Sequence, residues 1–152
     1  MVISVGNRLP SSSLVRMTDS GLEQTTIDQL TVGRKVILFG LPGAFTPTCS
    51  EKHMPSYIKC YQQLSEKGIE DIYCLSVNDE FVLNAWLLSY SETDGIKGIA
   101  DGNGDIAKSL NLLVDKSANY MGMRSTRFAM IVENNIIQEL FLFWVVYLVY
   151  TE

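Results

Sequence analysis

The chain has 152 residues, of which 47% are hydrophobic and 19% are charged, and its formal net charge is -5. This length fits one domain with a sizeable core, and the apolar content excludes an intrinsically disordered protein. The 12 Lys and Arg residues are outnumbered by 17 Asp and Glu residues and form no basic stripe, so we expect no nucleic-acid partner, because such binding requires neutralisation of phosphates.

The cysteines and the histidine are few: Cys49, Cys60, Cys74 and His53. Three cysteines without close pairs do not resemble a secreted disulfide framework, and the lack of a CxxC motif argues against a structural zinc site. The first ten residues, MVISVGNRLP, contain no charged segment followed by a long apolar core, so we expect no secretory signal. These features predict a cytoplasmic protein that holds no metal.

Strand-like and helix-like segments alternate along the chain. Two short apolar runs, 35–40 and 72–77, are typical of buried strands, and 96–100 is typical of a short strand. Segments with helical spacing follow each of them: 48–67, a helix through Leu88 that Asn78 or Asp79 caps, and 106–110. Gly68 is well placed to end the first helix, and Pro55 should kink it.

The last predicted elements form a hairpin. Two apolar runs at 128–132 and 136–140 flank Asn134 and Asn135, which is a strong signal for a tight turn. The alternation of strands and helices, followed by this hairpin, implies a mixed sheet covered by helices. We therefore predict a single-domain α/β protein with the thioredoxin-like pattern and extra N-terminal strands.

Cys49 follows the first predicted strand and lies at the start of the long predicted helix. In open α/β sheets, functional sites form beyond the carboxyl ends of the strands. A helix N-terminus offers unpaired N–H groups and the positive end of the helix dipole, and both favour a thiolate. Because the thiolate is the nucleophilic form of cysteine, we predict a reactive residue here rather than a small apolar residue that packs in the core.

The residues around Cys49 carry a family resemblance. The segment PGAFTPTCS, at 42–50, closely resembles the active-site segment of peroxiredoxins, and the spacing Pro42-x3-Thr46-x2-Cys49 matches their Pro/Thr/Cys signature. The segment GMRSTRFA, at 122–129, is similar to the one that supplies the family's active-site arginine.

A third segment narrows the resemblance to one branch. The residues CLSVND, at 74–79, with Trp86 beyond them, are similar to the type II, peroxiredoxin-V-like branch. The likeness covers nearly the whole chain, from about Ile3 to Leu140, and the three motifs occur in the order typical of the family.

The resemblance implies a thiol-dependent peroxidase that reduces hydrogen peroxide and small alkyl hydroperoxides without a metal or an organic cofactor. Cys49 would attack one peroxide oxygen and become a sulfenic acid. Thr46 would hydrogen-bond the thiolate and the peroxide, and Pro42 would shield the pocket from bulk water. Arg127 would hold the thiolate and stabilise the charge that moves onto the leaving oxygen.

Recycling of the oxidised cysteine leaves two interpretations open. In plant-like relatives a cysteine that resembles Cys74 is assigned as the resolving partner. Its place on a predicted inner strand instead favours a core residue, which could pair with Cys49 only after local unfolding. A one-cysteine cycle, with glutathione and glutaredoxin or with thioredoxin as the reductant, has equal weight. Cys60 lies on the apolar side of the long predicted helix, so we expect it to pack in the core.

His53 lies four positions, or one helical turn, after Cys49. A Cys–His pair that raises the thiolate content is one interpretation of this spacing. We favour a partly exposed helix residue, because Arg127 already supplies the charge that the mechanism requires.

The likeness stops after Leu140, so we predict a domain at 1–140 and an apolar tail at 141–152. The tail carries five aromatic residues, and it is too short for a membrane-spanning helix, which needs ~20 residues. Its β-branched and aromatic content favours an extension of the last strand. Of three explanations, we rank an altered or misread end of the coding sequence above a partner-binding strand and a membrane-surface tag. An uncovered apolar sheet face would then reduce solubility or produce unusual oligomers.

The resemblance also implies a homodimer, because related proteins of this branch dimerise through loops near the active site. We expect no membrane partner. The alternative function from another class is a non-catalytic protein, either a redox-regulated binding protein or holdase, or an inactive truncated isoform. The intact motif residues favour the enzyme, and the unusual tail favours the alternative.

Overall fold

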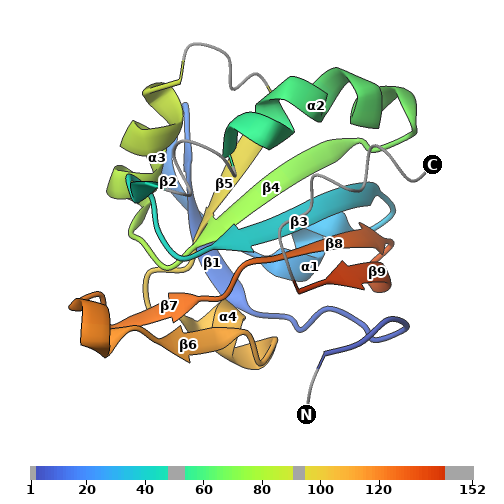
Figure 1. The fold of residues 1–152 in the computed structure, drawn as a ribbon. Helices are drawn as coiled ribbons and strands as arrows, with labels where there is room; N and C mark the ends of the chain where they lie inside the picture. Colours follow the sequence, from blue (N-terminus) through green and yellow to red (C-terminus); the bar gives the residue numbers. More distant parts are fainter. Residues whose placement is uncertain (1–2, 48–53, 91–94, 143–152) are drawn as a thin grey trace.

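The computed structural model describes residues 3–47, 54–90 and 95–142. A seven-stranded mixed sheet with the order β2-β1-β5-β4-β3-β8-β9 forms its centre (Figure 1). The strands of this sheet are β1 (Ser13–Thr18), β2 (Gly21–Thr26), β3 (Lys35–Leu41), β4 (Asp71–Ser76), β5 (Ile96–Ala100), β8 (Phe128–Glu133) and β9 (Ile136–Phe141). The helices are α1 (Ile27–Thr31), α2 (Met54–Glu66), α3 (Glu80–Leu88) and α4 (Asp105–Ser109).

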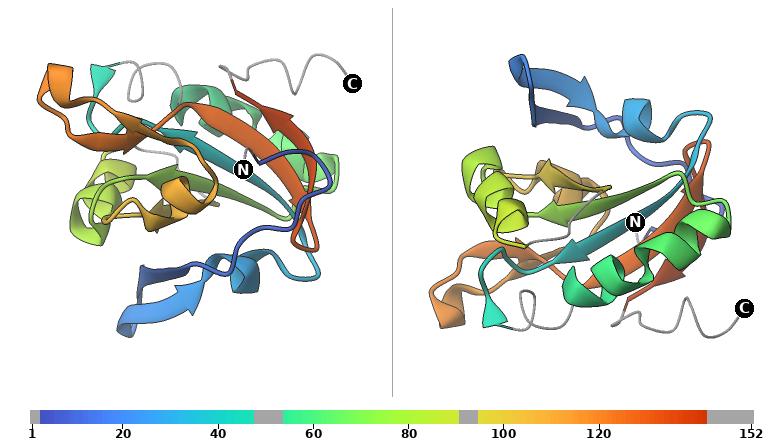
Figure 2. Two further views of the ribbon diagram at one scale, coloured as in Figure 1. Left: turned by 90° about the horizontal axis from the view of Figure 1, so that it is seen from below. Right: turned by 90° about the horizontal axis from the view of Figure 1, so that it is seen from above.

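The sheet combines parallel and antiparallel pairs, as we predicted from the order of the elements. Strands β3, β4 and β5 are parallel, whereas β8 pairs with β3, and β1 with β5, in the antiparallel direction. Helices α1 and α2 lie on opposite sides of the sheet (Figure 2). Side chains of α2 and α3 pack in one apolar cluster, and those of α1 and α4 pack in the other. The predicted α/β, thioredoxin-like arrangement is confirmed.

Local signals set the ends of the elements where we expected them. Gly68 has a φ of +92°, and its N–H donates to the carbonyl of Ser65 at 3.1 Å, while the N–H of Ile69 donates to that of Leu64 at 3.2 Å. This pair of bonds is a Schellman motif, which ends α2. The first part of the predicted helix, 48–53, lies outside the described residues, and the kink at Pro55 stays a prediction.

Two further local signals, a helix cap and a hairpin turn, are found where we expected them. The side chain of Asp79 accepts a hydrogen bond of 2.8 Å from the N–H of Val82, which caps the N-terminus of α3. Asn134 and Asn135 both have positive φ values, of 48° and 68°, which a tight turn between β8 and β9 requires. The hairpin and the cap are therefore confirmed.

A second, two-stranded sheet was not predicted. It consists of β6 (Leu113–Asp115) and β7 (Met123–Ser125), joined through a single 3-10 turn, η2 (Ser117–Asn119). Strands of three residues are too short to show an alternation of apolar and polar residues. This sheet lies below the main one in Figure 1 and brings residues 121–125 to the loop that follows β3.

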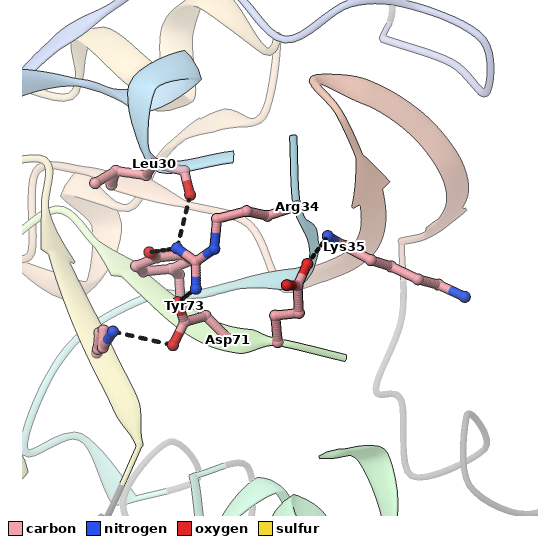
Figure 3. A network of polar contacts seen from close by, with 7 residues as sticks. Leu30, Arg34, Lys35, Asp71 and Tyr73 are labelled. Atoms are coloured by element: carbon pink, nitrogen blue, oxygen red, sulfur yellow. Dashed lines mark hydrogen bonds and ion pairs between the residues drawn. The ribbon is translucent and has the colours of Figure 1, made fainter. Parts of the chain in front are cut away.

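A polar network ties together the segments where β3, β4 and β5 begin. The carboxylate of Asp71, 7% exposed, forms an ion pair with Arg34 (Figure 3). It forms a second ion pair, of 3.0 Å, with Lys97. Arg34 also donates to the hydroxyl of Tyr73 and to the carbonyl of Leu30, each at 3.3 Å (Figure 3). We call these residues the Asp71 network; it lies at the sheet edge where the parallel strands start.

Candidate active site

Three of the predicted site residues, Pro42, Thr46 and Arg127, lie at the opposite edge of the sheet, where the parallel strands end. Pro42 directly follows β3, and Val77 directly follows β4, which runs parallel to it. Strand β8 runs the other way, and its first residue, Phe128, is in register with Gly40. Arg127, the residue before Phe128, therefore lies at the same edge of the sheet, on the side of β3 opposite to β4.

The loop after β3 is a compact turn. Pro42 is buried, and the hydroxyl of Thr46 donates a hydrogen bond of 2.6 Å to the carbonyl of Gly43. The N–H of Thr46 points to the same carbonyl at 3.4 Å. Phe45 has a φ of +62°, which is uncommon for a residue with a side chain, and 58% of it is exposed. The turn therefore fixes the Thr46 hydroxyl, three positions before Cys49.

Asn78 supports this turn from the loop after β4. Its Oδ1 atom accepts a hydrogen bond of 3.0 Å from the N–H of Ala44 and another of 2.5 Å from the hydroxyl of Ser76. A buried N–H without a partner costs free energy, so this contact stabilises the turn in one conformation. We had considered Asn78 only as a helix cap, a role that Asp79 fills.

Arg124 supports the turn from β7. Its Nε atom donates to the carbonyl of Met121 at 2.9 Å, and its Nη1 atom donates at 3.4 Å to the carbonyls of Pro42 and Val77. A Cβ atom added at Gly43 would lie 2.9 Å from this Nη1 atom, so glycine permits the close approach. The guanidinium thus joins three loops.

Sequence reasoning missed the roles of Arg124 and Asn78. Both lie within segments that carried the resemblance, 122–129 and 74–79, but no local pattern shows which backbone carbonyl or N–H a side chain reaches. The sequence also did not predict that Arg124 packs closely on Gly43, because a glycine in a loop is compatible with many roles.

Cys74 lies in the middle of β4, in register with Phe39 of β3 and Gly98 of β5. It is 0% exposed and belongs to the apolar cluster under α2 and α3. Burial raises the pKa of the Tyr57 phenol, with smaller contributions from Cys74 and Cys60. The ring of Tyr57 stacks on Phe39, with the ring centres 3.9 Å apart. Cys74 therefore occupies a tightly packed part of the core.

Two predicted residues, Cys49 and His53, lie outside the described residues. Cys60 lies on α2, half-buried against the same cluster as Cys74, as we expected. Within 3–47, 54–90 and 95–142, no group of three or more His, Cys, Asp or Glu residues could hold a metal ion. Across those same ranges, no helix has the length and apolar character needed to cross a membrane.

Comparisons with known proteins agree with this arrangement. The Redoxin family model matches residues 4–143. Peroxiredoxin-2C of Oryza sativa subsp. japonica is 45% identical over 133 residues, which are 87% of this chain and 82% of the relative. The chloroplastic peroxiredoxin-2E of Arabidopsis thaliana is 41% identical over 143 residues, which are 91% of this chain and 61% of that protein.

Solved structures give the same result. Reduced Prx3 of Vibrio vulnificus in complex with hydrogen peroxide has a TM-score of 0.89 at 40% identity, covering 93% of this chain and 89% of that one. The antioxidant protein of Plasmodium falciparum, a 1-Cys peroxiredoxin, has a TM-score of 0.86 at 39% identity, covering 92% and 84%. The chain therefore belongs to the peroxiredoxins, the thiol-dependent peroxidases of the redoxin family, and to their type II, peroxiredoxin-V-like branch.

Proposed function

We propose that Cys49 is the peroxidatic cysteine and that Thr46, Arg127 and Pro42 assist it. The Cys49 thiolate attacks one oxygen of the peroxide, and an S–O bond forms as the O–O bond breaks. The second oxygen leaves as hydroxide or alkoxide and takes up a proton, which yields water or an alcohol. The sulfur is oxidised to a sulfenic acid and the peroxide is reduced.

The convergence of Pro42, Thr46 and Arg127 at one sheet edge is the observation that carries this proposal. Cys49 follows Thr46 by three positions, so covalent geometry keeps its Cα atom within roughly 11 Å of the Cα atom of Thr46. An uncharged turn beside a half-buried arginine suits a reaction in which negative charge moves from sulfur to oxygen.

The geometry also suggests how Thr46 takes part. Its hydroxyl has one proton and two lone pairs, and the proton is used in the bond to Gly43. The oxygen can therefore accept a hydrogen bond from the protonated end of the peroxide. That bond would orient the O–O axis before the attack, since aligned reactants lower the entropic part of the barrier.

We further propose a one-cysteine cycle for recycling. An external thiol displaces water from the sulfenic acid to form a mixed disulfide, and a second thiol releases Cys49 and leaves as the oxidised disulfide. Glutathione with glutaredoxin, or thioredoxin, would supply these thiols. The complete burial of Cys74 in the central strand β4 favours this cycle, because a disulfide at Cys74 would require local unfolding around this strand. The similarity to a 1-Cys peroxiredoxin is compatible with it.

The decisive experiment compares the wild-type chain with Cys49→Ser, Cys60→Ser and Cys74→Ser. Stopped-flow measurement of thiol oxidation by hydrogen peroxide should give a rate far above that of a free thiol, lost only in Cys49→Ser. Mass spectrometry after one equivalent of peroxide should show a sulfenic acid or a mixed disulfide at Cys49. A Cys49–Cys74 disulfide would refute the one-cysteine cycle. A wild-type rate no faster than a free thiol would favour a non-catalytic binding protein or holdase.

We also propose that the protein is a cytoplasmic homodimer. Exposed apolar side chains near the site edge support the assembly: Phe45, Met123 and Tyr120, which is 99% exposed. Peroxiredoxin-2E of Arabidopsis thaliana is chloroplastic, so the compartment must be tested separately. Fractionation of cells that express the chain measures it. Sedimentation equilibrium of the wild type and Tyr120→Ser would test the dimer, which we expect the substitution to weaken.

The division into a domain at 1–140 and an apolar tail at 141–152 remains our proposal. Strand β9 ends at Phe141, within one residue of the proposed boundary, whereas residues 143–152 lie outside the described part. Matching stability and dispersity between this chain and a version with a family-like ending would contradict the expectation that the tail lowers solubility.

A further inference from the structure

Arg124 makes an unusual set of contacts for a half-buried cation. All three of its hydrogen bonds go to backbone carbonyls, those of Met121, Pro42 and Val77. Within the residues that the structure describes, no carboxylate forms an ion pair with it, in contrast to Arg34, which pairs with Asp71. A charge that is partly removed from water without a countercharge is costly, so its position needs a reason other than charge pairing.

The carbonyls identify what the guanidinium holds together. Pro42 begins the loop that leads to Thr46 and Cys49, Val77 begins the loop after β4, and Met121 precedes β7. A guanidinium is planar and has five donors in a fixed arrangement, so it can bridge several acceptors whose relative positions then become fixed. Removal of Arg124 would leave the Pro42 carbonyl, and the loop that follows Pro42 in the chain, without this restraint.

The guanidinium of Arg124 packs closely against the backbone of Gly43. The nearest atoms to a Cβ added there would be Arg124 Nη1 at 2.9 Å and Thr46 Cγ2 at 3.2 Å. The guanidinium and the Thr46 side chain therefore pack against the same face of the Gly43 backbone. The carbonyl of Gly43 is in turn the acceptor of the Thr46 hydroxyl. A change in the position of Arg124 is thus transmitted to Thr46 through one residue.

We propose that Arg124 is a positioning residue for the peroxidase reaction, which acts by fixing the Pro42–Gly43 backbone and, through it, the Thr46 hydroxyl. This inference rests on the proposed function, in which Thr46 aligns the peroxide for attack by Cys49. Displacement at an O–O bond requires an aligned peroxide, whereas alkylation of the same thiolate by a small electrophile involves no O–O bond to be aligned. Loss of Arg124 should therefore slow the peroxide reaction selectively.

The test compares Arg124→Met and Arg124→Lys with the wild type and with Arg8→Met. Met removes the charge and the donors but keeps an apolar chain, and Lys keeps the charge without the planar group. Arg8→Met makes the same change in charge at an exposed residue that bridges to Ile136, at the far end of the β8–β9 hairpin. For each protein, stopped-flow gives the rate constant with hydrogen peroxide, and iodoacetamide at varied pH gives the thiol pKa and the limiting alkylation rate of Cys49.

We expect the ratio of the peroxide rate to the limiting alkylation rate to fall by about tenfold or more in Arg124→Met, because small misplacements of reacting groups are costly. Arg124→Lys should recover part of this loss, and Arg8→Met should match the wild type. An unchanged ratio in Arg124→Met would overturn the proposal, and so would an equal fall in both rates, which indicates a general loss of structure.

Gly43→Ala provides a second route to the same contact and keeps the arginine. The added methyl group would displace the guanidinium, so the variant should lower the same ratio, and its effect should not add to that of Arg124→Met. Additive effects would contradict a shared contact. If Arg124→Met does not fold, this variant and Arg124→Lys decide the matter. A slow wild type would instead refute the role of Cys49, and the positioning role with it, whereas a fast wild type with unaffected variants refutes the positioning role alone.

Discussion

The two edges of the central sheet use arginine in opposite ways. At the edge where the parallel strands begin, Arg34 is paired with the buried carboxylate of Asp71, and Lys97 contacts the same carboxylate. At the edge where they end, Arg124 contacts only backbone carbonyls of three loops. The first arrangement neutralises charge, and the second leaves a positive charge beside the loop that leads to Cys49.

From this difference we expect the Asp71 network to affect mainly the stability of the fold, and the contacts of Arg124 to affect mainly the reaction with peroxide. The Asp71 network connects elements that already form the rigid sheet, so its loss should be felt as a loss of folding free energy. The contacts of Arg124 and Asn78 connect loops, and loops carry the functional groups while the sheet holds them in place. Substitutions at the two edges should therefore differ in which property they change, and we expect the effect on stability to decrease in the order Asp71, Asn78, Asp79 and Glu80.

Asp71→Asn should have the largest effect on stability and little effect on peroxide reduction. Removal of the carboxylate leaves two cations, those of Arg34 and Lys97, without their partner. Because these two side chains are 34% and 43% exposed, water compensates them in part, and we expect a loss of about 2 kcal/mol of unfolding free energy. Urea denaturation measures this loss, and stopped-flow oxidation measures the activity. A large fall in the peroxide rate of the folded variant would show that the two edges are coupled.

Asn78→Ala should affect both properties. The N–H of Ala44 and the hydroxyl of Ser76 would lose their acceptor, which should cost about 1.5 kcal/mol of unfolding free energy. The freed turn should also slow peroxide reduction several-fold while the alkylation rate of Cys49 changes little. Asn78→Asp keeps an acceptor at the same place and serves as the matched control. Equal behaviour of both variants would show that the hydrogen bond does not hold the turn.

Asp79→Ala should lower the unfolding free energy by about 1 kcal/mol, because α3 loses the side chain that caps the N–H of Val82. Asp79→Ser keeps a capping oxygen and should retain most of the stability. Thermal unfolding followed by circular dichroism measures both. A peroxide rate close to that of the wild type would separate this residue from its neighbour Asn78, which contacts the turn directly.

Glu80→Gln should have the smallest effect, visible as a change in pH dependence. Burial raises the pKa of the Glu80 carboxyl above its ordinary value of 4.5, against a smaller opposing effect of the bond from the N–H of Met17. A raised folded-state pKa means that the unfolding free energy falls as pH rises from about 4.5 through that pKa.

The neutral glutamine lacks this fall, so Glu80→Gln should be slightly more stable than the wild type at pH 7. We expect a difference of about 0.5 kcal/mol or less, since the group is only partly buried. Below pH 4.5 the difference should vanish. Urea denaturation at pH 4 and pH 7 checks both statements. A variant that is less stable than the wild type at pH 7 would show that the charge of Glu80 is favourable at the start of α3.

Most of the fold was predictable because its signals are local. The buried strands β3 and β4 are short, largely apolar runs, Gly68 ends α2 through its positive φ, and the two asparagines between β8 and β9 form the tight turn of a hairpin. Each of these depends on the conformational preference of a few neighbouring residues. The short β6–β7 sheet was missed because its strands of three residues carry no such pattern.

The sequence alone also determined the family and the identity of the candidate residues Cys49, Thr46, Arg127 and Pro42, because the motif spacings are specific. What only the tertiary structure decided is which groups hold the turn that contains Pro42 and Thr46. The contacts of Arg124 and Asn78 join segments that lie 34 to 82 positions from the turn residues Ala44 and Pro42. Such contacts depend on the register of β3 with β4 and β8, which no single segment of the chain encodes.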